Sequence, residues 1–351
     1  MRPSLIQAAK SVSPQIHVRN TSASPRHLMS IADLSPSEFT RLVLNAASHK
    51  KAFKAGAFPP RLKGSMAGPA VAMMFNKRST RTRVSTESAV SMMGGHAMFL
   101  GKDDIQLGVN ETLLDTSKVI SSMTSCIVAR VGPHSDLTGL AEHSSVPVIN
   151  ALSADFHPLQ TIADFLAIHE AFPPPSSALD GTAEPTLGLE GKKVAWVGDS
   201  NNVLFDLAIG CFKMGVEIAV ASPKGYGIPD RMRSLILSSG NSKLTETTVP
   251  EEAVKDADIL VTDTWVSMGQ EEETKKRLKA FEGYQITSEM AERGGAKPDW
   301  KFMHCLPRHP EEVSDEVFYG PRSLVFPEAE NRLWAAISAL EAFVVNKGNI
   351  V

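Results

Sequence analysis

Long apolar runs, paired cysteines and a basic stripe are all missing from this 351-residue sequence. No stretch approaches the ~18 consecutive apolar residues of a membrane-spanning helix. The three cysteines are widely spaced and form no CxxC pair, so the sequence indicates neither a disulfide framework nor a structural zinc site. The net charge of -3 comes without a dominant cluster of Lys and Arg, which argues against nucleic-acid binding.

Nucleotide-binding glycine patterns are missing as well. The turn 198–202 reads GDSNN, and Ser200 and Val203 stand where a dinucleotide fingerprint needs glycines. This excludes an NAD-dependent dehydrogenase, which an α/β pattern alone would permit. No Walker sequence indicates a nucleotide elsewhere. The sequence therefore predicts neither a cofactor nor a metal.

The first 32 residues lack acids, because the first acidic residue is Asp33. They contain Arg2, Lys10, Arg19 and Arg26, with recurrent Ser and Ala and scattered apolar residues. This composition is typical of a mitochondrial transit peptide, whereas a secretory signal has a continuous apolar core. We predict a transit peptide over approximately 1–32 and a location in the mitochondrial matrix. The alternative is a disordered basic tail without a targeting role.

Short apolar segments alternate with helical patterns from about Gly68 onward. Buried strands are predicted at 70–75, 126–131, 146–150, 193–197, 216–221, 259–262 and 302–305, and helices at 82–93, 158–172, 204–214, 250–257, 275–281 and 327–345. This alternation predicts an α/β protein with two doubly wound domains, each a central parallel sheet flanked by helices. A Pro/Gly/Ser-rich stretch that begins at Pro173 marks the boundary. The first domain is expected at 33–172, completed by the C-terminal helix 327–351, and the second at 173–326.

Three hydroxyls and four cations lie within residues 77–83, between a predicted strand and a predicted helix. Helix N-termini offer unpaired N–H groups and a partial positive charge, and Arg matches phosphate oxygens with a planar fork. The alternative is a capped helix with a solvated basic turn, but clustered cations at a helix start are unfavourable without an anion. We therefore predict phosphate binding by Ser79, Thr80, Arg81 and Thr82.

Polar residues also follow the other predicted strands, where ligands bind in open parallel sheets. Arg130 lies at the end of one strand, Asp263 follows another, and Cys305 ends a third. His157 precedes a helix, and Asn202 lies in an amide-rich turn. Four of these five residues have a structural alternative: an edge ion pair for Arg130, a helix-start role for His157, a plain turn for Asn202, and burial without chemistry for Cys305.

Together these segments resemble the aspartate/ornithine carbamoyltransferase family over roughly Leu28 to the C-terminus. The matching segments, in family order, are STRTR at 79–83, HPLQ at 157–160, DTWVSMGQE at 263–271, HCLP at 304–307 and the arginine of EAENR at 328–332. The loop 263–271 and the cysteine of HCLP are similar to the ornithine branch. The aspartate branch carries basic and amide residues in that loop and a proline in place of the cysteine.

The resemblance implies carbamoyl transfer from carbamoyl phosphate to the δ-amine of L-ornithine by a homotrimer with active sites between subunits, without a metal or cofactor. It implies a carbamoyl-phosphate site of Ser79, Thr80, Arg81, Thr82, Gln106, Arg130, His157, Gln160, Cys305, Leu306 and Arg332, in which Gln106 comes from a neighbouring subunit. The implied ornithine site is Asn202, Asp263, Ser267 and Met268. The implied catalytic residues are Asp263, Cys305, Arg130 and His157. A carbamoyltransferase for another amine and a non-catalytic ornithine-binding protein are the alternatives.

Overall fold

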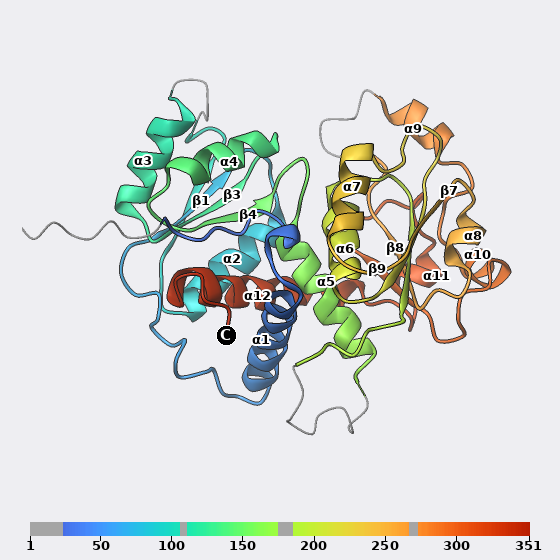
Figure 1. Cartoon of the computed structure of the whole chain (residues 1–351), viewed down its shortest axis with the longest axis horizontal. Coiled ribbons are helices and arrows are strands. Elements are labelled where there is room, and N and C mark those ends of the chain that lie inside the picture. The colour runs from blue at the N-terminus through green and yellow to red at the C-terminus, as the bar shows by residue number, and fades with distance from the viewer. Residues whose placement is uncertain (1–23, 106–110, 175–184, 267–272) are drawn as a thin grey trace, which may run out of the picture.

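The computed structural model describes residues 24–105, 111–174, 185–266 and 273–351. Two lobes lie side by side, and each contains a parallel sheet with helices on its faces (Figure 1). This confirms the predicted fold class. Among the described residues, no helix has both the length and the apolarity that crossing a membrane requires.

The sheet of the first domain has the strand order β2-β1-β3-β4. Its strands are β1 (Val71–Phe75), β2 (Ala97–Gly101), β3 (Cys126–Arg130) and β4 (Val148–Leu152). All five residues are buried in both central strands, β1 and β3, because helices cover both faces. These strands pair in parallel with Phe75 opposite Arg130. The segment that follows β1 therefore starts beside Arg130.

Helices of the first domain surround this sheet, and the C-terminal helix joins them. They are η1 (Ile31–Asp33), α1 (Pro36–Lys54), α2 (Thr80–Met92), α3 (Leu113–Met123), α4 (His134–His143) and α5 (Pro158–Ala171). The C-terminal helix α12 (Val325–Leu340) continues into a π-helical turn, η4 (Glu341–Val345). It leaves the second lobe and packs against α1, α2 and α5 of the first (Figure 1).

The second domain has a five-stranded parallel sheet in the order β7-β6-β5-β8-β9. Its strands are β5 (Lys193–Val197), β6 (Glu217–Ala221), β7 (Leu244–Thr247), β8 (Ile259–Thr262) and β9 (Lys301–His304). Its helices are α6 (Asn202–Lys213), α7 (Asp230–Ser238), α8 (Pro250–Val254), α9 (Thr274–Ala280), α10 (Ser288–Arg293) and α11 (Asp315–Phe318). The strand order reverses at β5, so a crevice forms between the loops that follow β5 and β8.

Residues 26–32 belong to the folded first domain. Leu28 and Ile31 are fully buried, and Leu28 exchanges backbone hydrogen bonds with the neighbourhood of β4. Removal of residues 1–32 would strip these side chains from the core. Arg26 also belongs to the fold, because its side chain pairs with Glu38 of α1 at 2.6 Å. We therefore place the end of the proposed transit peptide before Arg26.

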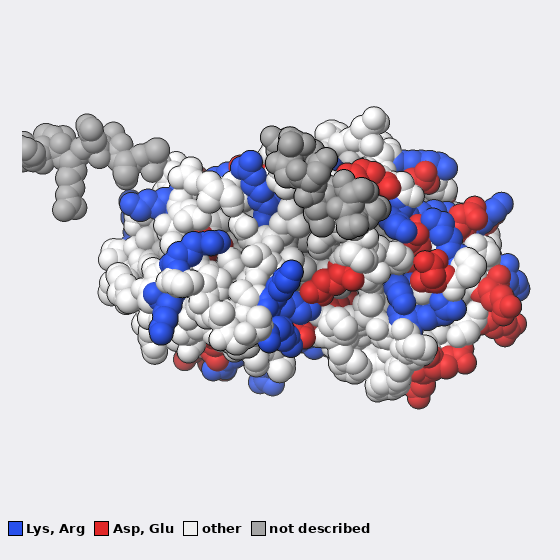
Figure 2. Space-filling view, turned by 90° about the horizontal axis from the view of Figure 1, so that it is seen from below, with Lys and Arg blue, Asp and Glu red and all other residues white. Residues whose placement is uncertain are grey.

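Charged side chains are spread over the surface without a continuous basic stripe on the face shown in Figure 2. On the described part of that face, Lys and Arg lie in separate groups, and those of the second domain lie mostly beside acids.

Candidate active site

The predicted phosphate-binding segment forms the first turn of α2. The hydroxyl of Ser79 accepts a hydrogen bond from the Thr82 backbone N–H at 3.3 Å and caps the helix. The helix begins at Thr80, two residues earlier than predicted, because this cap completes the turn. Thr80, Arg81 and Thr82 therefore lie at the positive end of α2, as anion binding requires.

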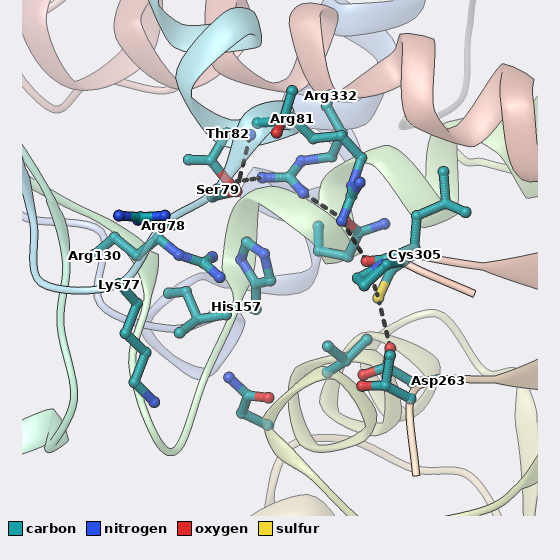
Figure 3. A pocket seen from close by; sticks show the side chains of 18 of the residues that line it. Lys77, Arg78, Ser79, Arg81, Thr82, Arg130, His157, Asp263, Cys305 and Arg332 are labelled. Atoms are coloured by element: carbon teal, nitrogen blue, oxygen red, sulfur yellow. Dashed lines mark hydrogen bonds between the residues drawn. The ribbon is translucent and has the colours of Figure 1, made fainter. Parts of the chain in front are cut away.

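Two arginines from distant parts of the chain face this turn. Arg332 of α12 donates to the Thr82 hydroxyl at 3.2 Å and to Gln160 Oε1 at 2.5 Å. Arg81 donates to the Leu306 carbonyl oxygen at 2.5 Å and so joins the first domain to the second. Figure 3 shows the Arg81 and Arg332 guanidinium groups beside each other above the cavity.

Arg130 and His157 form the next part of the cavity wall (Figure 3). Burial, together with the charges of Arg332 and Arg81, lowers the pKa of Arg130 to about 10. Burial and the same arginines, with Arg130, hold the pKa of His157 well below its ordinary value, so its imidazole is neutral. Neither Arg130 Nε nor His157 Nδ1 has a hydrogen-bond partner within the described parts of the chain. Buried polar atoms of this kind are available to hydrogen-bond a ligand.

An acid and a thiol form the opposite side of the cavity. Asp263 follows β8 and accepts from Cys305 Sγ at 3.0 Å and from Asn201 Nδ2 at 2.8 Å. Burial and the neighbouring Asp263 raise the pKa of Cys305 well above its ordinary value, so the thiol stays protonated and donates. Asn202 donates to the Ser153 carbonyl oxygen at 2.6 Å. Its side chain thus links α6 to the segment after β4.

The turn before α9 is held from two directions. The Trp265 N–H donates to Glu312 Oε1 at 3.2 Å, and its carbonyl oxygen accepts from Arg277 Nε at 2.5 Å. Arg277 also pairs with Asp199, at the end of β5. Burial raises the pKa of Asp199 to about 6 despite this pairing. These contacts fix the backbone that presents Asp263.

One cavity of about 640 Å³ between the domains unites the two sides. Twelve predicted site residues line it, and they are Ser79, Thr80, Arg81, Thr82, Arg130, His157, Gln160, Asn202, Asp263, Cys305, Leu306 and Arg332. The predicted residues Gln106, Ser267 and Met268 lie outside the described residues. Lys77 and Arg78 belong to the cation cluster 77–83 but were not predicted as contacts, and they line the cavity together with His309 and Glu311.

Two acids beneath the cavity were also missed. Asp164 and Glu328 both accept from Gln160 Nε2, at 2.7 and 2.8 Å. Asp164 lies four residues after Gln160 on α5, a spacing that places side chains on one helix face. That spacing was the available signal, whereas nothing in the sequence indicated that Glu328 would reach the same amide.

Asp263, His304 and Cys305 lie close enough together to be considered as metal ligands. Both ring nitrogens of His304 are engaged, however. Nδ1 accepts from the Leu306 N–H at 2.9 Å, and Nε2 contacts Glu312 at 3.0 Å. A metal also requires the thiolate of cysteine, and the surroundings of Cys305 favour the protonated thiol. These side chains do not fit a metal site.

Guanidinium groups and a helix N-terminus on one wall, with an acid and amides on the other, suit a phosphorylated donor and an amine acceptor. The fold and this cavity define a two-substrate transferase. Residues 26–170 match the carbamoyl-P binding domain of aspartate/ornithine carbamoyltransferases, and residues 190–343 match their Asp/Orn binding domain. The chain belongs to the aspartate/ornithine carbamoyltransferase family.

Individual relatives agree with this family. The chain is 68% identical to an ornithine carbamoyltransferase, mitochondrial, of Emericella nidulans, over 99% of this chain and 97% of the relative. It is 69% identical to the protein of the same name in Coccidioides immitis, over 96% and 98%. The crystal structure of a mitochondrial ornithine carbamoyltransferase from Coccidioides immitis superposes with a TM-score of 0.86, at 66% identity, over 93% of this chain and 100% of that one. These names confirm the predicted mitochondrial localisation at the level of the organelle.

Proposed function

We propose that this protein transfers the carbamoyl group of carbamoyl phosphate to the δ-amine of L-ornithine, giving L-citrulline and phosphate. The main support is the cavity between the domains, in which the arginines of the first domain lie opposite the Asp263–Cys305 pair of the second. Relatives named ornithine carbamoyltransferase, which this chain matches along almost their whole length, support this proposal, as do the two family domains of the chain.

The first domain binds the donor in this proposal. Ser79, Thr80, Arg81 and Thr82 hold the phosphate at the N-terminus of α2, where backbone N–H groups and guanidinium forks both match its oxygens. Arg332 completes that site from α12 and already donates to Thr82. The carbamoyl NH₂ group donates to Gln160 Oε1 and to the Leu306 carbonyl oxygen, since each acceptor has a second lone pair beside the arginine that it now binds.

The carbonyl oxygen of the donor faces the orphan donors of Arg130 and the neutral His157, with the Thr82 hydroxyl nearby. As the amine attacks, the C–N bond forms and negative charge develops on that oxygen. Donors already fixed in place stabilise this charge at no reorganisation cost. The intermediate then collapses, the C–O bond to phosphate breaks, and phosphate leaves with the bonding electron pair.

Ornithine binds on the second domain, held by Asn202 and Asp263 with Ser267 and Met268. Its δ-ammonium has a pKa of about 10.4 in water, so a proton must leave before attack. This first proton passes to solvent, and Asp263 and Cys305 steer the neutral amine. The departing phosphate accepts the second proton, which the attacking nitrogen loses once the C–N bond has formed. Cys305 acts as a protonated donor and not as a covalent nucleophile, because its thiol is neutral and already hydrogen-bonded to Asp263.

We also propose a homotrimer in which Gln106 of a neighbouring subunit reaches the phosphate. Exposed apolar side chains on three elements of the first domain support a subunit contact there: Val84 of α2, Met98 of β2, and Val119 and Met123 of α3. Light scattering coupled to gel filtration measures the mass directly. A monomer would contradict this part of the proposal.

The decisive experiment compares acceptors with the purified chain. Carbamoyl phosphate is supplied with L-ornithine, L-aspartate, putrescine or N-acetylornithine, and carbamoylated product is measured at steady state. We expect ornithine to have the highest kcat/KM. If putrescine were the better acceptor, the roles given to Asn202 and Asp263 in holding the α-carboxylate and α-ammonium would be wrong. A chain that binds ornithine but forms no citrulline would instead be the non-catalytic alternative.

A further inference from the structure

Two buried carboxylates share one amide group beneath the donor half of the cavity. Gln160 Nε2 donates to Asp164 Oδ1 at 2.7 Å and to Glu328 Oε1 at 2.8 Å. All three side chains are at most 2% exposed. Two ionised acids this close together in a buried site repel each other strongly. The site therefore favours a pair that carries fewer than two negative charges.

A single proton shared by the pair satisfies that condition. Burial raises the pKa of Asp164 to about 7, and burial followed by the charge of Asp164 raises the pKa of Glu328 well above its ordinary value. The positive charge of Arg332 lowers the pKa of both acids and so opposes these shifts. With one proton the pair carries one negative charge, which balances the buried Arg332 guanidinium.

The acids also dictate which way the Gln160 amide faces. A carboxylate accepts hydrogen bonds, so the amide NH₂ group turns toward Asp164 and Glu328. Gln160 Oε1 then faces Arg332 Nη1 at 2.5 Å and the cavity that Gln160 lines. A flipped amide would place its oxygen against the acids and its NH₂ group against a guanidinium. Both contacts would be repulsive, and the wrong end of the amide would face the substrate.

Glu328 extends this control to the second domain. Its other carboxylate oxygen, Oε2, accepts from the His304 backbone N–H at 3.1 Å. His304 ends β9 and immediately precedes Cys305 and Leu306, whose carbonyl oxygen accepts from Arg81. Both carboxylate oxygens of Glu328 thus accept a hydrogen bond: Oε1 from Gln160 of the first domain and Oε2 from His304 of the second.

We propose that Asp164 and Glu328 are positioning residues that hold one proton between them and fix Gln160 as a hydrogen-bond acceptor, so that the cavity selects a carbamoyl group over an acyl group of the same shape. An acetyl group carries a methyl in place of the donating NH₂. A site built to accept from an NH₂ group rejects an analogue that lacks it, because the buried acceptor is then left without a partner. This inference rests on the proposed function, in which Gln160 receives the carbamoyl NH₂ group.

The two acids respond differently to amide substitution. Both Glu328 oxygens accept from N–H groups, so we place the shared proton on Asp164. Asp164→Asn mimics that protonated acid, because its oxygen accepts from Gln160 while its NH₂ group donates to Glu328. Glu328→Gln has one oxygen for two donors, Gln160 Nε2 and the His304 N–H, so one of them loses its acceptor. Glu330→Gln is the matched control, since this acid lies on the same helix but pairs with Lys54 at the surface.

The test uses the full chain and its three variants. It measures the KM for carbamoyl phosphate and the inhibition constant of acetyl phosphate as its competitor. We expect Glu328→Gln to raise the KM for carbamoyl phosphate on the order of tenfold to a hundredfold, as for loss of a buried hydrogen bond to a charged group. The inhibition constant of acetyl phosphate should rise less than threefold. The preference of this variant for carbamoyl phosphate over acetyl phosphate therefore falls. Asp164→Asn and Glu330→Gln should keep both constants within about threefold of the parent.

Three results would overturn the inference. If Asp164→Asn were as damaging as Glu328→Gln, the site would require two charges and not one shared proton. If Glu328→Gln weakened both phosphates equally, with an unchanged melting temperature, Glu328 would support the fold without selecting the substrate. Unchanged selectivity in every variant would mean that the orientation of Gln160 does not matter. A parent chain that forms no citrulline contradicts the proposed function alone, because equilibrium binding of the two phosphates then gives the same ratio.

Discussion

Asp263 and Cys305 leave the ends of two neighbouring strands at the same level and form a 3.0 Å hydrogen bond. The register explains this, because Thr262 of β8 pairs with His304 of β9. Asp263 comes directly after Thr262, and Cys305 comes directly after His304. Adjacent parallel strands therefore deliver an acid and a thiol to one point of the cavity. The contact defines Cys305 as a donor whose proton points at Asp263.

Alkylation of Cys305 should be slow at neutral pH. The reactive species is the thiolate, and burial with the nearby Asp263 raises the pKa of this thiol well above its ordinary value. We expect the rate with iodoacetamide to keep rising with pH through pH 9 without reaching a plateau, measured by mass spectrometry of the Cys305 peptide. Rapid modification at pH 7 that reached a plateau by pH 8 would contradict the assigned protonation state.

Arg81→Ala should abolish most citrulline formation while the fold is kept. This change removes a guanidinium from the phosphate site and its link to the Leu306 carbonyl oxygen. We expect kcat/KM for carbamoyl phosphate to fall by at least about a thousandfold, as for loss of charged contacts to a transferring phosphate. Arg83→Ala is the control, because Arg83 is exposed and pairs with Glu87 one turn along α2. Equal losses in both variants would place the phosphate elsewhere.

His157→Gln should reduce the loss of stability in acid. The unfolded histidine has a pKa near 6.5, whereas burial and three nearby arginines hold the pKa of folded His157 well below that value. Below pH 6.5 the unfolded chain therefore binds a proton that the folded chain does not, and the native state loses stability. At pH 5 this loss amounts to at most about 2 kcal/mol, the limit set by the unfolded pKa.

The measurement is the free energy of unfolding in denaturant at pH 7.5 and pH 5, for the parent and for His157→Gln. Substitution of the exposed His96 serves as the control. If the parent and His157→Gln lost the same stability between these pH values, His157 would be protonated in the folded protein.

Asp206→Ala should destabilise the junction between the domains. This buried carboxylate of α6 accepts from the Ser30 hydroxyl at 2.7 Å, the Ile31 N–H at 3.0 Å and the His157 N–H at 2.7 Å. Three buried donors would lose their acceptor, which costs about 3 kcal/mol or more. Urea denaturation measures this as a lower midpoint, and Asp230→Ala, which removes an exposed acid on α7, should change little. An unchanged midpoint would show that water replaces the carboxylate.

Strands with a continuous buried pattern were predictable from the sequence, including the edge strands β4 and β9, whereas the partly buried edge strands β2 and β7 were not. β5 and β8 have the predicted bounds, because Val194 to Val197 and all of β8 form short, continuously buried runs. β7 (LTET) and β2 (AMFLG) lie at the sheet edges and are only partly buried, so neither shows an uninterrupted buried pattern. The missed helix α1 did carry a signal, since Ser35 and Glu38 form a capping box before its apolar face.

The site was predictable wherever chemistry is concentrated in a short segment. Residues 79–82 carry their own cap, charges and helix start, so their role is visible locally. Arg332 was identified through the family resemblance alone, because no local pattern relates it to Thr82, 250 residues away. Glu328 could not be linked to Gln160 from sequence for the same reason. Tertiary packing alone sets the distance between side chains on different helices.

The sequence by itself determined two parallel α/β domains and the chemical character of the strand ends, because periodicity, helix capping and charge act within a few residues. Only the tertiary structure decided how Asp263 meets Cys305, how Arg81 reaches Leu306 and how two acids come to share the Gln160 amide. Those contacts depend on strand register and on the packing of α12 across the first domain, and both are set by the burial of apolar surface far from the site.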